Sequence, residues 1–297
     1  MRFNVSSASE DDSSSVGHEG ITKATGLPDS LPAYSGDPDG HPAVARKDRS
    51  GSGGGPESLA AASSRRSSIA AAIVVGLIAV SVPSLLIVNA VRVLASDWFV
   101  RYELELDGFP SDRYGFTRSE RIDLALTGLR SIEPGSEGIA LLERAALPDG
   151  SRAFNDRELR HMADVRRLLG RALNAQLAAL ALILALALAS SRSTRWRSVV
   201  PRGLVIGSLG TLGILVVAVP VVLLGFDGLF LRFHEVFFSG ETWRFSTKDT
   251  LLRLYPEVFW QHAARLASAI VFLQAIAVAL FACFWLRGVR PVSQGAA

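Results

Sequence analysis

The chain has 297 residues, of which 49% are hydrophobic and 20% are charged, and its formal net charge at pH 7 is +3. This small charge, with arginines interspersed among acids, does not indicate nucleic-acid binding. The single cysteine, Cys283, excludes an intramolecular disulfide. The apolar residues gather in four blocks of about 20 residues or more, long enough to cross a membrane. We therefore predict an all-α polytopic membrane protein with four transmembrane helices.

The first 66 residues are rich in Ser, Gly, Asp and Pro and contain no apolar run, which predicts a disordered tail. Four spans follow, and a short second tail closes the chain. The predicted spans are about 68–95, 168–189, 203–226 and 264–286, and the second tail is 291–297. The first span contains Pro83, which we expect to kink it.

Basic residues concentrate in three short flanks of the predicted spans. They are Arg65 and Arg66, then Arg192, Arg195, Arg197 and Arg202, and finally Arg287 and Arg290. Short basic flanks stay on the cytoplasmic side of a membrane. We therefore expect a plasma-membrane protein with both termini in the cytoplasm. The two long connections, 96–167 and 227–263, would then be extracytoplasmic.

The first extracytoplasmic segment contains three predicted elements. Alternating residue types over 97–107 suggest a short strand or extended piece. Thr117 and Glu120 have the spacing of a capping box and predict the start of a helix. Asn155 and Glu158 have the same spacing, and the helix that they begin can run without interruption into the second span.

Two histidines are the candidate catalytic residues. His161 precedes Leu168, the start of the second span, by seven residues, which places it about 10 Å above that span, at the ester level of the outer leaflet. His234 lies in an aromatic stretch typical of a membrane interface. Two imidazoles at one depth suit acyl transfer on a lipid, because histidine exchanges protons near neutral pH.

Other interpretations of these histidines remain open. Each can be a simple interfacial anchor, and Asp164, which shares the helix face of His161, can pair with a neighbouring arginine instead. A metal site of His161, His234 and either Asp164 or Glu235 is geometrically possible, but no HxxxH or HExxH spacing supports it. We assign no metal. His262, beside the fourth span, is a weaker candidate.

Two stretches of the sequence are similar to a known protein family. The first, before the second span, is FNDRELRHMADVRRLL, and the second, between the third and fourth spans, is FHEVFFSGETWRFSTKDTLLRLYPEVFW. Together they resemble the bacterial lipoprotein intramolecular transacylase family, long known only as four-span integral membrane proteins of unknown function. The resemblance covers about residues 68–286, and YGFTRSERIDLA in the first connection also fits.

The resemblance implies an acyl transfer on mature lipoproteins. Family members move the sn-2 acyl chain of the diacylglyceryl group on the N-terminal cysteine to the α-amine of that cysteine, which yields a lyso-lipoprotein. The partners would be diacylglyceryl-modified lipoproteins and membrane lipid, with no cofactor. The two histidines thought essential in the family match His161 and His234. Supporting or substrate-positioning residues within the matched motifs would be Asn155, Trp243 and Asp249, although capping, interfacial anchoring and turn formation explain them equally well.

Our hypothesis makes His161 the general base for the attacking amine, with Asp164 fixing its tautomer. His234 would stabilise the oxyanion or protonate the departing glyceryl oxygen, and the reverse assignment is equally allowed. Two other functions compete with this one: a metal-dependent membrane hydrolase, and a non-catalytic membrane scaffold or sensor that works through its N-terminal tail.

Overall fold

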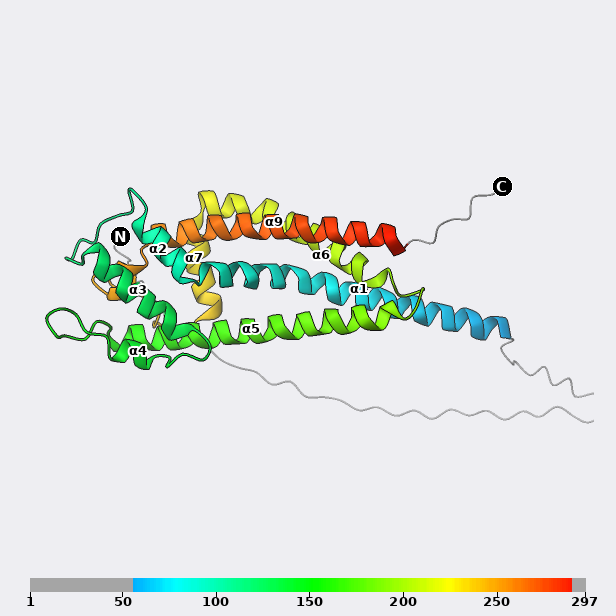
Figure 1. Cartoon of the computed structure of the whole chain (residues 1–297), viewed down its shortest axis with the longest axis horizontal. Coiled ribbons are helices and arrows are strands. Elements are labelled where there is room, and N and C mark those ends of the chain that lie inside the picture. The colour runs from blue at the N-terminus through cyan, green and yellow to red at the C-terminus, as the bar shows by residue number, and fades with distance from the viewer. Residues whose placement is uncertain (1–55, 290–297) are drawn as a thin grey trace, which may run out of the picture. The chain divides into compact units, whose positions relative to one another are not determined.

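The computed structural model describes residues 56–289 and contains helices but no strand within that range, so the all-α prediction is confirmed. The helices are α1 (Pro56–Leu94), α2 (Asp97–Glu105), α3 (Arg118–Ile132), α4 (Ala140–Glu143), α5 (Asp156–Ser191), α6 (Val199–Leu224), α7 (Phe226–Phe237), α8 (Thr250–Leu254) and α9 (Glu257–Val289) (Figure 1). The predicted tails lie outside the described residues, except for residues 56–66, which form the first turns of α1.

Four helices, α1, α5, α6 and α9, are long and apolar enough to cross a membrane, as predicted. With 39, 36, 26 and 33 residues, they exceed the roughly 20 residues that the hydrocarbon core requires. Residues 56–66 were expected to be disordered but are helical, because Pro56 suits a first helical turn and the following alanines favour helix. α1 continues through Pro83 as one helix.

The spans pack through α6, which contacts both α1 and α9. Gly203 and Gly207 of α6 allow α1 to approach closely, since a Cβ atom on Gly207 would come within 2.7 Å of the Ala79 carbonyl oxygen. Ile78 and Val82 of α1 fill this contact and are buried. Many other apolar side chains of the four spans are exposed, which is the surface expected of helices surrounded by lipid.

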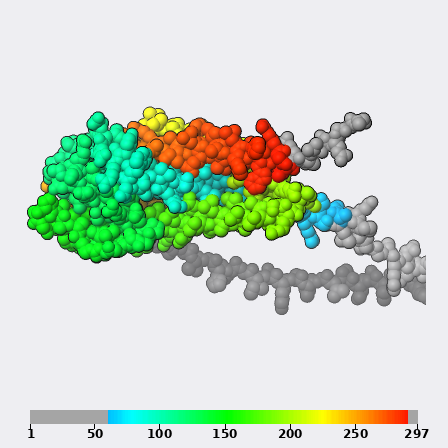
Figure 2. All heavy atoms as spheres, viewed as in Figure 1, coloured from blue at the N-terminus to red at the C-terminus, as the bar shows by residue number. Residues whose placement is uncertain are grey.

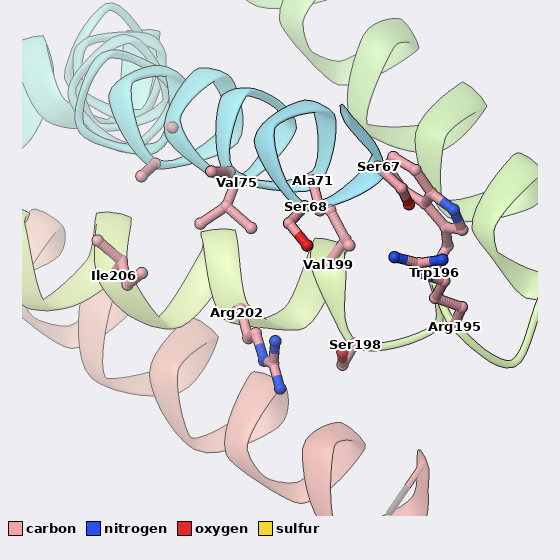
Figure 3. A pocket seen from close by; sticks show the side chains of 13 residues that line it. Ser67, Ser68, Ala71, Val75, Arg195, Trp196, Ser198, Val199, Arg202 and Ile206 are labelled. Carbon is pink, nitrogen blue, oxygen red and sulfur yellow. The ribbon is translucent and has the colours of Figure 1, made fainter. Parts of the chain in front are cut away.

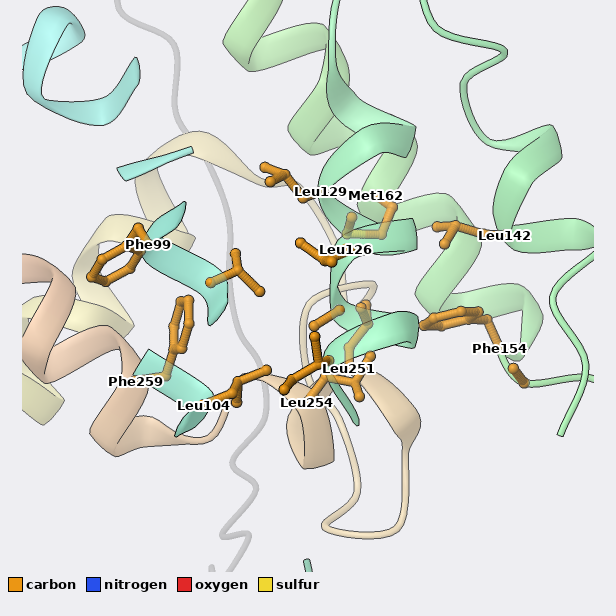
Figure 4. Packing of buried hydrophobic residues seen from close by; sticks show 14 of the residues in the cluster. Phe99, Leu104, Leu126, Leu129, Leu142, Phe154, Met162, Leu251, Leu254 and Phe259 are labelled. Carbon is orange, nitrogen blue, oxygen red and sulfur yellow. The ribbon is translucent and has the colours of Figure 1, made fainter. Parts of the chain in front are cut away.

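We call the remaining helices, α2, α3, α4, α7 and α8 with their loops, the helical cap. Figure 4 shows its hydrophobic core, in which aromatic and leucine side chains of separate helices meet. Its largest buried members include Phe99, Phe154, Leu142 and Leu254. The atoms of α2 to α4 gather at one end of the spans (Figure 2).

The segment predicted as a short strand, 97–107, is instead helix α2, so that prediction was wrong. Ser96 caps the helix by accepting a hydrogen bond from the Phe99 N–H at 3.4 Å. The buried residues Phe99, Val100, Glu103 and Leu104 recur at helical spacing, whereas a strand would bury every second residue. The periodicity over these positions therefore favours a helix docked on the cap core.

Candidate functional site

The first side of the site is the start of α5. Asn155 accepts hydrogen bonds from the N–H groups of Arg157 and Glu158 at 3.0 and 3.1 Å, and Glu158 accepts one from the Asn155 N–H at 2.7 Å. This confirms the predicted capping box. His161 follows within one turn and is 8% exposed. Seven residues separate it from Leu168, so it stands about 10 Å outside the predicted span.

The second side of the site is α7, a short helix that is separated from the end of α6 only by Gly225. It carries His234, which is also 8% exposed. The Nδ1 atom of His234 lies 2.8 Å from the carbonyl oxygen of Phe230. Because a carbonyl oxygen can only accept a hydrogen bond, Nδ1 carries the proton. The neutral ring therefore keeps its lone pair on Nε2, which is the form a general base requires.

The structure brings the two histidines together although they are far apart in the sequence. The ring centroids of His161 and His234 lie 6.0 Å apart, with their planes inclined at 24°. Aromatic rings enclose the pair: Phe238 and Phe245 lie 4.9 and 5.3 Å from His161, and Trp243 lies 5.1 Å from His234. The two imidazoles thus lie in a largely apolar enclosure.

This enclosure governs the protonation of both histidines. Burial lowers the pKa of His161 to about 4; the nearby His234 adds to this effect and Asp164 opposes it. Burial also lowers the pKa of His234, while its hydrogen bond to the Phe230 carbonyl acts in the opposite direction. Both imidazoles are therefore neutral at pH 7 and able to accept a proton.

The connection between α7 and α8, residues 238–249, is fastened to the start of α5. The Asn155 side-chain amide donates to Asp249 at 3.0 Å, and Arg157 donates to the Arg244 carbonyl oxygen at 2.9 Å. The buried carboxylate of Glu158, besides completing the capping box, accepts a hydrogen bond from the Leu251 N–H at 2.6 Å. These bonds hold Trp243 and Phe245, which lie on the same connection, against the histidines.

The structure does not show the hydrogen bond expected between Asp164 and His161. The Asp164 carboxylate is paired with Arg167 on the same helix, and no hydrogen bond joins it to His161. The Nδ1 atom of His161 is buried and has no hydrogen-bond partner within residues 56–289. His262, the weaker candidate, lies elsewhere and pairs with the buried Glu103.

The carboxylates considered as metal ligands are also engaged elsewhere. Glu235 forms an ion pair with Arg232 at 2.9 Å. Asp164 is paired with Arg167, as described above. Across the described part of the chain, no three side chains of His, Cys, Asp or Glu lie close enough together to hold a metal ion. This arrangement does not favour the metal-dependent hydrolase.

Comparison with known proteins places this chain in a family. Residues 76–260 match the family described as "Lipoprotein intramolecular transacylase Lit". An uncharacterized protein from Aquifex aeolicus (strain VF5) is 31% identical over 188 residues, which cover 63% of this chain and 82% of that protein.

Solved structures of one membrane protein share the fold. The membrane integral lipoprotein intramolecular transacylase Lit from Bacillus cereus aligns with a TM-score of 0.61 and 18% identity, covering 74% of this chain and 98% of that one. A variant of that protein with one histidine replaced by alanine aligns with a TM-score of 0.57 and 17% identity, covering 75% and 97%. From the family match over residues 76–260, the chain belongs to the lipoprotein intramolecular transacylase family.

Proposed function

We propose that this protein transfers an acyl chain from the diacylglyceryl group of a lipoprotein's N-terminal cysteine to the α-amine of that cysteine, leaving a lyso-lipoprotein. The observation that carries the proposal is the pair of buried, neutral imidazoles, His161 and His234, 6.0 Å apart just outside the predicted spans. The name of the family, and that of the Bacillus cereus protein with the same fold, support lipoproteins as the substrate class.

The proposed orientation places this site on the outer face of the plasma membrane, with both termini in the cytoplasm. The support is the distribution of arginines. The connection between α5 and α6 contains three arginines and no acidic residue, Arg202 follows in the first turn of α6, and α9 ends near Arg287. By the positive-inside rule that end of the spans is cytoplasmic, so the cap and both histidines face outward.

In the proposed reaction, His234 is the base. The cysteine α-amine, an ammonium ion at neutral pH, must lose a proton before its nitrogen can attack the ester carbonyl carbon. The tautomer of His234, with Nδ1–H bound to the Phe230 carbonyl, presents the Nε2 lone pair for this purpose. This reverses our first assignment, in which His161 took the proton with help from Asp164.

His161 then acts on the oxygen atoms. Attack by the amine forms a carbon–nitrogen bond and a tetrahedral oxyanion, which a ring N–H of His161 can stabilise as a hydrogen-bond donor. Collapse of this intermediate breaks the bond between the carbonyl carbon and the glyceryl oxygen. That oxygen takes the proton held by His234 and leaves as a hydroxyl group. The nitrogen then gives its second proton to the imidazole thus freed, which passes it to water, and the product is a neutral amide. Donor and acceptor belong to one molecule, so no covalent enzyme intermediate or cofactor is needed.

The aromatic enclosure explains why the acyl chain would reach an amine rather than water. Phe238 is buried beside His161, and Phe230 lies 4.2 Å from His234. Apolar rings around the base limit the water that could be activated for hydrolysis. In this proposal Asn155, Asp249 and Trp243 are positioning residues, because they hold the α7–α8 connection or contact His234.

The experiment is expression in a bacterium that lacks such an activity, followed by mass spectrometry of lipopeptide N-termini. We expect N-acyl lyso-lipoproteins with the natural protein and with Asp164→Asn, and none with His161→Gln or His234→Gln. Normal membrane levels of each variant must be verified by immunoblotting. Lyso forms that persist in both histidine variants would contradict the proposal, and so would their absence with the natural protein.

A further inference from the structure

A cavity of about 580 Å³ lies between α1 and α6 (Figure 3). It lies near the start of α1 and the end of α5, whereas His161 lies near the start of α5, so the cavity and the histidines are at opposite ends of the spans. Its volume is within the range of about 300–1,000 Å³ typical of small-ligand sites. On the proposed function's orientation this is the cytoplasmic side of the membrane, but the cavity itself does not depend on that function. The mechanism makes no use of it.

The lining of the cavity is partly polar and partly apolar. Arg195, Arg202 and Ser68 line it together with Trp196, the residue type that concentrates at membrane interfaces (Figure 3). Within residues 56–289, neither arginine forms an ion pair with a carboxylate; Arg195 donates only to the Ser64 carbonyl oxygen, at 3.4 Å. The lining thus carries two positive charges and no counter-charge.

The apolar wall of the cavity is formed by small residues of α1. A Cβ atom added to Gly76 would meet nothing within 4 Å, in contrast to Gly203 and Gly207, where α6 touches α1. Ala72 and Ala79 continue the same shallow wall. α1 and α6 therefore touch at Gly203 and Gly207. Between this contact and Arg195 they leave a groove with room for a hydrocarbon chain.

We propose that this groove binds one anionic phospholipid of the adjacent leaflet. The phosphate lies between Arg195 and Arg202, and an acyl chain follows α1 past Gly76. Charge complementarity selects an anionic headgroup, because a guanidinium binds a phosphate through paired hydrogen bonds. The apolar wall distinguishes a lipid from a free anion.

The test is native mass spectrometry of the full-length protein in detergent, titrated with phosphatidylglycerol or with phosphatidylethanolamine. We expect phosphatidylglycerol to bind more tightly. The double variant Arg195→Gln, Arg202→Gln should bind it about 25-fold more weakly, since the loss of each direct guanidinium–phosphate contact weakens binding about fivefold. The matched control is Arg192→Gln, Arg197→Gln, which removes the same charge from residues outside the cavity, where no direct contact with the phosphate is made, and should keep the affinity within about twofold.

A second pair of variants tests the groove rather than the charge. Gly76→Leu should fill it and weaken phosphatidylglycerol binding about tenfold or more, because the added side chain occupies the space of the acyl chain. Gly213→Leu introduces the same side chain into open space away from the cavity and should leave binding unchanged. Three results would each overturn the proposal. The two arginine double variants could lose the same phosphatidylglycerol affinity, Gly76→Leu could bind the lipid as tightly as the natural protein, or 10 mM inorganic phosphate could displace the lipid.

Discussion

The carboxylate of Glu158 connects the start of α5 to the start of α8, and its replacement by glutamine should loosen the site. Its two oxygens accept hydrogen bonds from the N–H groups of Leu251 and Asn155, at 2.6 and 2.7 Å, and the residue is 1% exposed. Burial raises the pKa of Glu158, although both hydrogen bonds act in the opposite direction.

Glutamine retains one acceptor oxygen and places an NH₂ group against the other backbone N–H. One charge-assisted hydrogen bond, which contributes about 1.5–3 kcal/mol, is lost, and removal of a buried charge offsets part of this loss. We expect Glu158→Gln to lower the free energy of unfolding by about 2 kcal/mol. The matched control is Asp156→Asn, whose carboxylate is exposed and pairs with Arg152, and which should cost less than about 1 kcal/mol.

Two measurements check this prediction. Thermal unfolding in detergent reports the stability difference between the two variants. Hydrogen exchange reports the local effect: the amide of Leu251 or Asn155 should exchange about 30-fold faster in Glu158→Gln, which corresponds to about 2 kcal/mol. Transfer activity should fall as well, because Trp243 and Phe245 lose their anchorage. If Glu158→Gln matches Asp156→Asn in stability and exchange, the connection does not hold the site as described.

Three further predictions follow from the same geometry. Burial lowers the pKa of His161 from 6.5 to about 4, so the unfolded chain binds more protons than the folded chain between these pH values. The free energy of unfolding should therefore be highest above pH 6.5 and fall by up to about 3 kcal/mol toward pH 4. Urea unfolding should show a weaker pH dependence for His161→Phe. Asn155→Ala and Asp249→Ala should each lower transfer activity, and the double variant should cost about 1 kcal/mol less than the sum, as a double-mutant cycle measures. Gly207→Ala should lower the melting temperature, because its Cβ would press on α1 at 2.7 Å, whereas Gly210→Ala, which meets nothing within 4 Å, should not.

The features that the sequence predicted correctly depend on local interactions. Apolar length alone predicts the four spans, and the capping boxes at Thr117 and Asn155 involve side chains and N–H groups within four residues of each other. The proximity of His161 and His234 was a weaker expectation, based on their common depth in the membrane. In the structure it depends on α7 crossing toward α5, which no local pattern specifies.

The errors arose where long-range packing or a competing partner decides the outcome. Residues 97–107 alternate like a strand, but the cap core selects the helical face of Phe99 and Leu104. Asp164 is as close in sequence to Arg167 as to His161, and the arginine takes its carboxylate. The second hydrogen bond of Glu158 reaches Leu251, a partner that lies far along the chain and leaves no signal in the local sequence.

A crossover experiment tests whether the two neutral histidines transfer the acyl chain to the α-amine of the same molecule. The purified protein is given two diacylglyceryl lipopeptides together, one with a deuterated sn-2 acyl chain and a heavier peptide. For intramolecular transfer we expect mass spectrometry to find each acyl chain on the amine of its own peptide, and we expect His234→Gln to abolish both products. Exchange of acyl chains between the peptides, release of free fatty acid as the main product, or full activity in His234→Gln would contradict it.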